Sequence, residues 1–237
     1  MAFGTLFTTA ENSRSIAIKV IAKAHKLELN MVYAELGNPS IEHLEVNKLG
    51  KIPTFVGEGG FVLSECIAVA LYFTSQDENT TLLGKNKEEY ASIVSWMSYF
   101  NSEILIPLAD WFGPLLGKAP YNREYVENRS KATLRAIKVV EEHLGNCTFI
   151  VGEVLSLADI FCAGLLFRGF QFFFDKKWRQ EHPNVTRWYE GITSQSIYSD
   201  VVPKLEVLEK PALTNKPPEK PFVPRQAAVL DVSDVKG

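Results

Sequence analysis

The stretch that decides the fold is GKIPTFVGEGGFVLSECIAVALYFTSQ, residues 50–76. Two short apolar runs, IPTFV and FVLS, flank a turn that contains three glycines, and this pattern predicts a β-hairpin. The segment that follows, ECIAVALYFTSQ, is apolar on nearly all sides and suits a buried helix. The stretch therefore predicts two strands and then a helix, in that order.

The chain before this stretch supplies the remaining elements of the same domain. GTLFTT at 4–9 and MVYAEL at 31–36 predict two further strands, and IEHLEVNKL at 41–49 predicts a short helix. Between the first two strands, apolar residues recur at helical spacing over residues 14–27. The order β-α-β-α-β-β-α implies a four-stranded sheet with helices on both faces, over residues 1–78.

The chain changes character after this domain. No strand pattern occurs over residues 87–208, and long helical periodicities predict an all-helical domain. SLADIFCAGLLFRGFQFFF, residues 156–174, is unusually apolar and should form its central helix. Five of the twelve prolines then fall between Pro211 and Pro224, so residues 209–237 are predicted to be an extended tail, disordered or laid over the surface.

The composition excludes several classes of function. Hydrophobic residues make up 46% of the 237 residues and charged residues 22%, which is typical of a globular protein. A net charge of −3 argues against a nucleic-acid surface, and the lack of a long apolar run argues against a membrane span. The N-terminus has no secretory signal pattern, and the three cysteines form no C-x-x-C pair, so we expect a reducing cytoplasmic location and no disulfide scaffold. The four histidines are scattered, and no metal site is expected.

The first candidate feature is the Lys51-Ile52-Pro53 junction before a strand. If the Ile52–Pro53 bond is cis, the backbone N–H and C=O of Ile52 point out of the sheet edge, where an extended peptide could pair with them as an added strand. The alternative is an ordinary trans-proline turn, which is the commoner conformation of X-Pro bonds.

The second candidate feature is Ser64-Glu65-Cys66 at the start of the buried helix. A helix N-terminus carries free N–H groups and a partial positive charge that bind a carboxylate, and Glu65 could pair with an α-ammonium group. Together they would hold an amino-acid head group. The alternative is a Ser64 N-cap followed by a first-turn glutamate. Cys66 is also a candidate for a reactive thiol, because a helix N-terminus lowers a thiol pKa.

The third candidate feature is Ser13, in the loop that enters the first predicted helix. A hydroxyl in this position can donate a hydrogen bond to a thiolate, which lowers the pKa of the thiol and raises its reactive fraction at neutral pH. Taken alone, Ser13 is more simply interpreted as a helix cap.

In combination these motifs resemble the cytosolic glutathione transferase family. The strand with its Ser-Arg loop, GKIPTF, the hairpin, SECIAVALYF and the capping box in GEVLSLADI carry the resemblance, which spans residues 4–205. Within the family, GTLFTTAENSR, FIVGEVLSLADI and WRQEHPNVTRWYEGITSQ are most similar to the glutathione-transferase-like N-terminal domain of the translation elongation factor 1 gamma subunit, with theta-class transferases next. The resemblance implies a thioredoxin-like N-terminal domain with a cis Pro53 and an all-helical C-terminal domain.

The resemblance also implies roles for individual residues. Ser13 matches the serine that activates glutathione in theta-type enzymes. The positions that match glutathione-binding positions of the family are Arg14, Lys51, Ile52, Pro53, Glu65 and Cys66. Cys66 departs from the family pattern, which has a serine that binds the γ-glutamyl carboxylate. Because a thiol is a poorer donor than a hydroxyl, this departure is expected to weaken glutathione binding.

Two functions follow from the resemblance. The first is an enzyme that conjugates reduced glutathione to an apolar electrophile, which would sit in a cleft lined by Trp111, Phe112 and Phe167. The second is a non-catalytic interaction module that docks the nucleotide-exchange subunit of the elongation factor 1 complex. The resemblance also implies a homodimer with twofold symmetry.

Overall fold

The N-terminal sheet has four strands in the order β2-β1-β3-β4. β1 (Gly4–Thr8) pairs in parallel with β2 (Leu29–Tyr33) and antiparallel with β3 (Thr54–Gly57), and β3 pairs antiparallel with β4 (Val62–Ser64). The computed structural model describes residues 2–10, 12–34, 37–220 and 222. The mixed sheet agrees with the order of elements that the sequence predicts.

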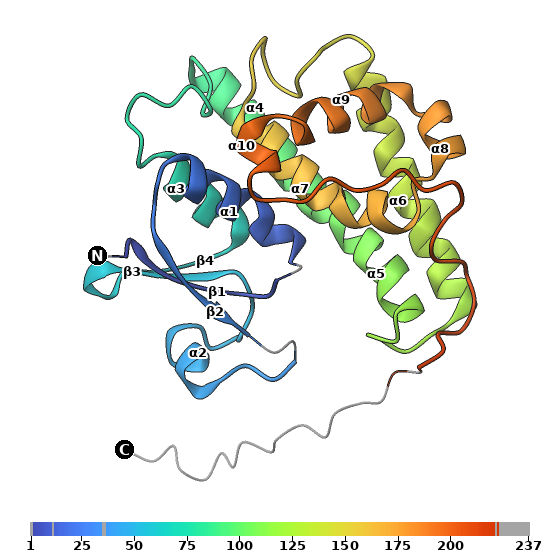
Figure 1. Ribbon diagram of the computed structural model, residues 1–237, viewed down its shortest axis with the longest axis horizontal. Helices are drawn as coiled ribbons and strands as arrows, with labels where there is room; N and C mark the ends of the chain where they lie inside the picture. Colours follow the sequence, from blue (N-terminus) through green and yellow to red (C-terminus); the bar gives the residue numbers. More distant parts are fainter. Residues whose placement is uncertain (1, 11, 35–36, 221, 223–237) are drawn as a thin grey trace.

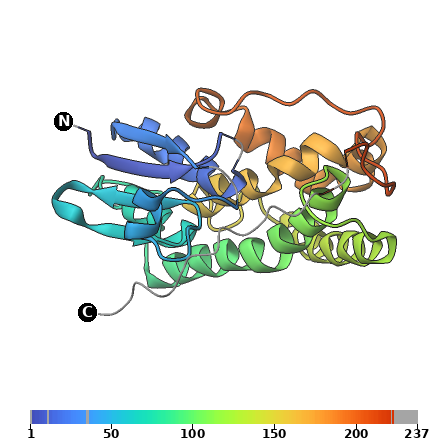
Figure 2. The same ribbon diagram turned by 90° about the horizontal axis from the view of Figure 1, so that it is seen from below.

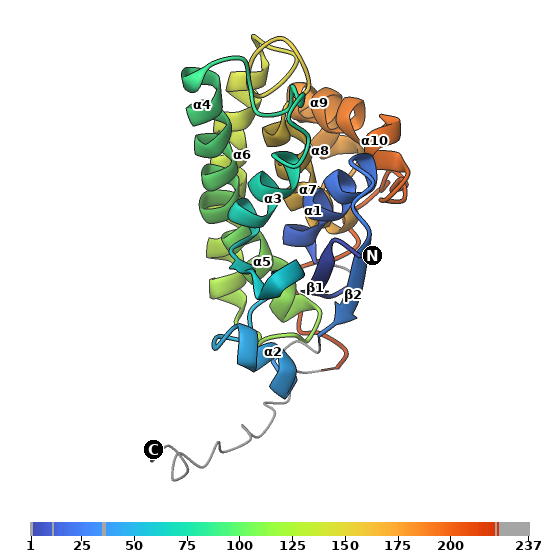
Figure 3. The same cartoon turned by 90° about the vertical axis from the view of Figure 1, so that its left-hand side faces the viewer.

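Helices cover both faces of this sheet. α1 (Ser13–Ala24) and α3 (Cys66–Thr74) lie on the face toward the rest of the chain, and α2 (Ile41–Val46) lies on the opposite face (Figures 1 and 3). A short 3₁₀ turn, η1 (Glu58–Gly60), joins the two strands of the hairpin. The inner face is strongly apolar, with Leu6 and Phe55 fully buried beneath α1 and α3.

The second half is entirely helical in its described residues. Its elements are α4 (Lys87–Tyr99), the π-helical segment η2 (Phe100–Leu105), α5 (Ile106–Leu115), α6 (Arg123–Leu144), α7 (Leu157–Phe172), α8 (Lys176–Glu181), α9 (Pro183–Thr193) and α10 (Ser196–Ser199). η2 continues α4 without a break into α5, so these three segments form one long helix. The view from below shows the blue and cyan N-terminal half beside the green to orange helical half (Figure 2).

α7 is the central helix and joins the two halves. It packs against α1 from the N-terminal half and against α4 and α9 from its own half. The approach to α1 is close: a Cβ added to Gly164 would lie 3.1 Å from the Cβ of Ile16. A glycine at this position therefore lets the two helices meet without a gap, and it fixes how the halves are placed.

The start of α7 is fixed by a buried carboxylate. Oδ2 of Asp159 accepts a hydrogen bond from the backbone N–H of Ser156 (2.9 Å), which is one half of the predicted capping box, and a second from the Ser156 hydroxyl (2.7 Å). Oδ1 accepts from the backbone N–H of Ile150 and from the indole Nε1 of Trp188, both at 2.8 Å. Burial raises the pKa of Asp159, and these four donors oppose that shift.

The described part of the C-terminal segment lies on the helical half. The backbone N–H of Lys176 donates to the carbonyl of Leu208, and that of Ala212 donates to the carbonyl of Phe172, both at 2.8 Å. The hydroxyl of Tyr121 donates to Oδ1 of Asn215 at 3.0 Å. The segment has no helix or strand over residues 203–220 and runs across the helices in red (Figure 1). Residues 221 and 223–237 of the predicted tail lie outside the described residues.

Candidate functional site

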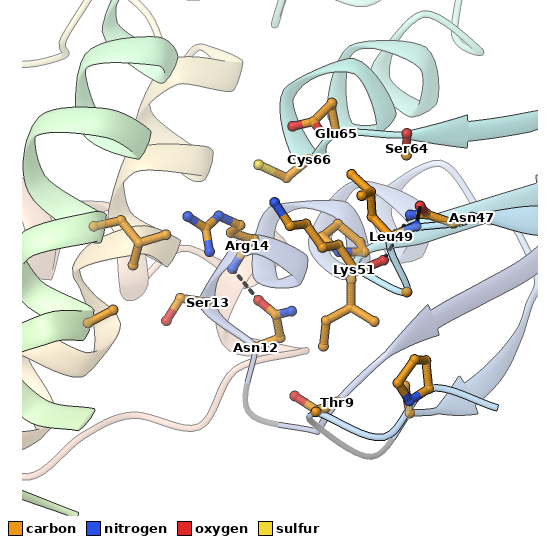
Figure 4. A pocket seen from close by; sticks show the side chains of 18 of the residues that line it. Thr9, Asn12, Ser13, Arg14, Asn47, Leu49, Lys51, Ser64, Glu65 and Cys66 are labelled. Carbon is orange, nitrogen blue, oxygen red and sulfur yellow. Dashed lines mark hydrogen bonds between the residues drawn. The ribbon is translucent and has the colours of Figure 1, made fainter. Parts of the chain in front are cut away.

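A cleft of about 1000 Å³ opens between the two halves (Figure 4). Its N-terminal wall comes from the entry to α1, the loop before β3 and the junction of β4 with α3. Its other wall comes from η2, α5 and α7. The residues that line the cleft include Asn12, Ser13, Arg14, Asn47, Lys51, Ile52, Pro53, Glu65, Cys66, Asn101, Leu105, Ala109, Phe112, Lys118 and Arg168. The three features that the sequence singles out therefore meet in one place.

Ser13 is the first residue of α1, and its neighbour provides the helix cap. Oδ1 of Asn12 accepts a hydrogen bond from the backbone N–H of Arg14 at 2.9 Å, so the interpretation of Ser13 as the cap is wrong. Ser13 is 8% exposed and lines the cleft. Among the described residues its hydroxyl has no hydrogen-bond partner, so it remains available to a ligand at the positive end of α1.

The Ile52–Pro53 peptide bond is cis, as expected. Lys51 is exposed, Ile52 is half-buried and Pro53 is buried, and all three line the cleft. The carbonyl of Lys51 accepts hydrogen bonds from the hydroxyl of Thr54 (2.7 Å) and the amide of Asn47 (3.2 Å). The loop before β3 is thus held by side chains from α2 and from β3.

Glu65 occupies the N-cap position of α3, and Ser64 is the last residue of β4. The expected alternative of a Ser64 cap is therefore wrong, and the Glu65 side chain makes no capping hydrogen bond. Glu65 has φ 69° and ψ 115°, a conformation that costs an L-residue about 1–3 kcal/mol. The strained turn points an exposed carboxylate toward the cleft beside the free N–H groups of α3 (Figure 4).

Cys66 is an un-ionised thiol at neutral pH. The residue is 4% exposed, and burial raises the pKa of its thiol to about 11, with Glu65 adding to the shift and Arg14 opposing it. The expectation that the helix N-terminus makes this thiol reactive is therefore wrong, because burial outweighs the helix end. Its sulfur lies 3.8 Å from Oδ1 of Asn101, the acceptor that the thiol faces.

Asn101 is a cleft residue that the sequence did not reveal. It lies in the π-helical segment η2, and its Oδ1 also accepts a hydrogen bond from Nε of Arg14 at 3.0 Å. Asn101 therefore ties Arg14 of α1 and Cys66 of α3 to the helical half. π-helical segments are frequent at functional sites, but nothing in the residue pattern of 87–106 distinguishes one from an α-helix.

The far end of the cleft is lined by a different set of residues from the one predicted. Phe112 lines it with Leu105 and Ala109, as a predicted electrophile site requires. Trp111 instead stacks on Phe173, with ring centroids 3.7 Å apart and planes 8° apart, and Phe167 is not among the lining residues. Adjacent residues of a helix point about 100° apart, so Phe112 and Arg168 face the cleft while the residues before them turn away.

No group of three or more metal-ligating side chains occurs among the described residues. Within the same residues no helix is both long and apolar enough to cross a membrane. Arg14, Lys51, Lys118 and Arg168 bring positive charge to the cleft, and Glu65 brings a carboxylate. The arrangement suits a small ligand that carries carboxylates and one ammonium group.

Comparison with known proteins identifies the family. Residues 2–75 match the family model for the glutathione S-transferase N-terminal domain, and residues 88–196 match the model for the C-terminal domain. Over 235 residues the chain is 50% identical to glutathione S-transferase psoE of Aspergillus fumigatus, and the alignment covers 98% of each protein. The chain belongs to the glutathione S-transferase family.

Two further relatives place this family member more closely. Glutathione S-transferase stcT of Emericella nidulans is 45% identical, over 89% of this chain and 98% of the relative. The crystal structure of the GST-like domain of elongation factor 1-gamma from Saccharomyces cerevisiae superposes with a TM-score of 0.77 at 30% identity, over 92% of this chain and all of that domain. The expected similarity to elongation factor 1-gamma is confirmed, at lower identity than to the two fungal transferases.

Proposed function

We propose that the protein conjugates reduced glutathione to an apolar electrophile, with the Ser13 hydroxyl stabilising the glutathione thiolate. The observation that carries this proposal is the cleft, where Ser13, the Lys51–Pro53 loop and Glu65 face one ligand-sized space with an apolar far end. The match of both family models and the 50% identity to a named glutathione S-transferase support it.

In this proposal the N-terminal wall holds the tripeptide. The Ile52 backbone pairs with the glutathione backbone, and Lys51 and Arg14 balance its carboxylates. Glu65 pairs with the γ-glutamyl ammonium group, and the N–H of Cys66 at the start of α3 binds the γ-glutamyl carboxylate. Leu105, Ala109 and Phe112 form the site for the apolar electrophile.

The chemical gain comes from ionising the thiol and from proximity. A thiol of ordinary pKa, about 8.5, is about 3% ionised at pH 7, and lowering that pKa by about two units raises the thiolate fraction roughly 25-fold. The thiol gives its proton to solvent, and the thiolate then forms the new S–C bond at the electrophilic carbon. The bond from that carbon to the leaving group breaks, and the leaving group departs with the electron pair, as chloride in the case of 1-chloro-2,4-dinitrobenzene. Holding both reactants in one cleft makes this step effectively unimolecular.

The test compares the wild type with Ser13→Ala. Isothermal titration with reduced glutathione should give similar dissociation constants for both proteins, because the tripeptide contacts lie elsewhere. Conjugation of 1-chloro-2,4-dinitrobenzene should fall at least tenfold in kcat in the variant, with a matching rise in the bound thiol pKa measured by thiolate absorbance. A fully active Ser13→Ala protein would show that this role is wrong.

A second candidate function is docking within the elongation factor 1 complex. The observation that favours it is the likeness to the GST-like domain of yeast elongation factor 1-gamma. Pull-down with the nucleotide-exchange subunit tests it, and no complex at micromolar concentration would count heavily against it. The two functions are compatible, because docking would use the outside of the fold.

We also propose a homodimer in the cytoplasm. Phe61 and Val62 are 45% and 39% exposed at the start of β4, which is an edge strand of the sheet, and such an apolar edge suits a partner. Light scattering during gel filtration should give twice the chain mass of 26.6 kDa. The cytoplasmic location rests on the sequence, whose three cysteines form no C-x-x-C pair and no disulfide scaffold pattern.

A further inference from the structure

His43 is a buried histidine that neither the sequence motifs nor the proposed chemistry uses. It is fully buried, and its ring stacks on Phe7 of β1 with centroids 4.7 Å apart and planes 10° apart. It is also the one fully buried side chain of α2, a helix of six residues. A helix this short is not stable by itself, so His43 anchors α2 to the sheet.

Nε2 of His43 faces the loop before β3 and acts as a hydrogen-bond donor. Nε2 lies 3.2 Å from the carbonyl oxygen of Lys51 and 3.2 Å from the hydroxyl of Thr54. The Thr54 hydroxyl donates its own proton to the Lys51 carbonyl, at 2.7 Å. Both oxygens next to Nε2, the Lys51 carbonyl and the Thr54 hydroxyl, can therefore only accept a hydrogen bond from it. The imidazole therefore carries its proton on Nε2 and donates. Nδ1 is buried and has no hydrogen-bond partner among the described residues.

The same carbonyl is held by a second residue that depends on α2. Asn47 is the C-cap of α2, and its amide donates to the Lys51 carbonyl at 3.2 Å and to the Thr54 hydroxyl at 2.8 Å. His43, Asn47 and Thr54 thus converge on one oxygen. This cluster fixes the plane of the Lys51–Ile52 peptide bond.

The direction of this plane matters because a trans peptide points its C=O and N–H to opposite sides. The Lys51 carbonyl points into the cluster, so the N–H of Ile52 points away from it, on the side of the loop that lines the cleft. Among the described residues the Ile52 N–H has no hydrogen-bond acceptor, and so it is open to a ligand carbonyl.

We propose that His43 is a positioning residue for glutathione: its Nε2–H holds the Lys51 carbonyl so that the Ile52 N–H faces the tripeptide backbone. The proposal rests on the proposed glutathione site and adds a residue from the opposite face of the sheet. His43 does not touch the ligand. It acts through the Lys51–Ile52 peptide plane, and burial lowers its pKa, which keeps the ring neutral as the donor arrangement requires.

The test uses His43→Phe, which keeps an aromatic ring against Phe7 and removes both ring nitrogens, including the Nε2–H donor. The dissociation constant for reduced glutathione should rise about fivefold, the worth of one net hydrogen bond. The thermal midpoint should stay the same or rise, because the variant also removes the unpartnered Nδ1 and leaves the carbonyl two donors. In steady-state assays the KM for glutathione should rise while kcat stays constant, since Ser13 is untouched.

Two further variants separate positioning from general damage. His43→Gln restores a donor without the ring and should bind glutathione within twofold of the wild type. His25→Phe is the matched control, because its Nδ1 is likewise buried without a partner but His25 caps the far end of α1. It should leave glutathione binding unchanged.

The outcomes distinguish this proposal from the proposed function. If the wild type gives no binding heat at several millimolar glutathione, the glutathione site itself is refuted. If the wild type binds and His43→Phe binds equally well, only the positioning role is refuted. A His43→Phe protein that loses stability and affinity together, without rescue by His43→Gln, would reduce His43 to a structural anchor and would also overturn the proposal.

Discussion

Replacing Cys66 by serine should tighten glutathione binding, and the structure allows the size of the effect to be worked out. The Cys66 side chain lies at the N-terminus of α3, where the γ-glutamyl carboxylate is proposed to bind, and its sulfur is 3.8 Å from the Asn101 acceptor. A thiol is a weak donor, whereas a hydroxyl in the same place donates well to a carboxylate. A hydrogen bond to a charged group contributes about 1.5 kcal/mol or somewhat more, so the dissociation constant should fall by about tenfold.

Part of this gain is offset in the free protein. The residue is only 4% exposed, so the new hydroxyl has to be desolvated, and without ligand it can donate only to Asn101. The hydrogen bond to Asn101 has to be given up when the ligand binds, and a loss of about 0.5 kcal/mol for this exchange reduces the expected improvement to about fivefold. Isothermal titration with reduced glutathione measures it directly. Cys66→Ala is the control, because it keeps the backbone N–H and removes the side-chain donor, and it should bind no better than the wild type.

The reasoning fails if Cys66→Ser binds glutathione no more tightly than the wild type while it remains folded. It also fails if Cys66→Ala and Cys66→Ser improve binding equally, because the gain would then come from the smaller side-chain volume. Thermal unfolding of the three proteins checks that any difference in affinity does not reflect a damaged fold.

Three further predictions concern stability. Asp159→Ala should lower the free energy of unfolding in urea by about 3–5 kcal/mol, because it leaves four buried donors unpaired, and Asp159→Asn should cost less because its amide oxygen still accepts. The pKa of His43 is lower in the folded than in the unfolded protein, so the unfolded state binds more protons below about pH 6.5. The free energy of unfolding should therefore fall as the pH drops through this range. A difference in unfolding free energy between wild type and His43→Phe that stays constant from about pH 5 to 7.5 would contradict this. Gly117→Ala should destabilise the protein by about 1–3 kcal/mol, because Gly117 has φ 67° and an added Cβ would lie 2.1 Å from the Lys220 carbonyl oxygen. Gly113→Ala in α5 is the control: its added Cβ meets nothing within 4 Å, so it should be neutral or stabilising. Denaturant unfolding measures both variants.

The residues of the proposed glutathione site could be located from the sequence because each of its parts is local. A residue at a helix start, a residue before a proline and a residue that opens a buried helix can each be located from a few neighbouring residues. Ser13, Ile52 and Glu65 were found in this way and reach the same cleft. Two cap positions differ from the expected ones. Asn12, not Ser13, is the cap of α1, and Glu65, not Ser64, occupies the N-cap position of α3.

The residues of the proposed electrophile site could not be predicted in the same way, because the directions in which the side chains of α5 point depend on η2. A π-helical turn takes up more residues than an α-helical turn, so it shifts the direction of every side chain that follows. Helical periodicity counted along α4 therefore gives no reliable direction for Trp111 or Phe112, which follow the segment Phe100–Leu105. The same segment brings Asn101 to the cleft. The burial of Cys66 could not be predicted from the sequence either. Burial raises the pKa of this thiol, whereas the helix N-terminus alone predicts a lowered pKa.

The capping of α1 bears directly on the choice between catalysis and docking. A serine that caps a helix donates or accepts within its own backbone and has little left for a ligand. In this structure Asn12 satisfies the backbone N–H of Arg14, which frees the Ser13 hydroxyl at the same helix end. An interaction module would gain nothing from a free hydroxyl that faces a cleft of about 1000 Å³, whereas thiolate stabilisation requires one. The pairing of a capping asparagine with an uncommitted serine therefore favours the enzyme, and the elongation-factor likeness describes the scaffold that carries it.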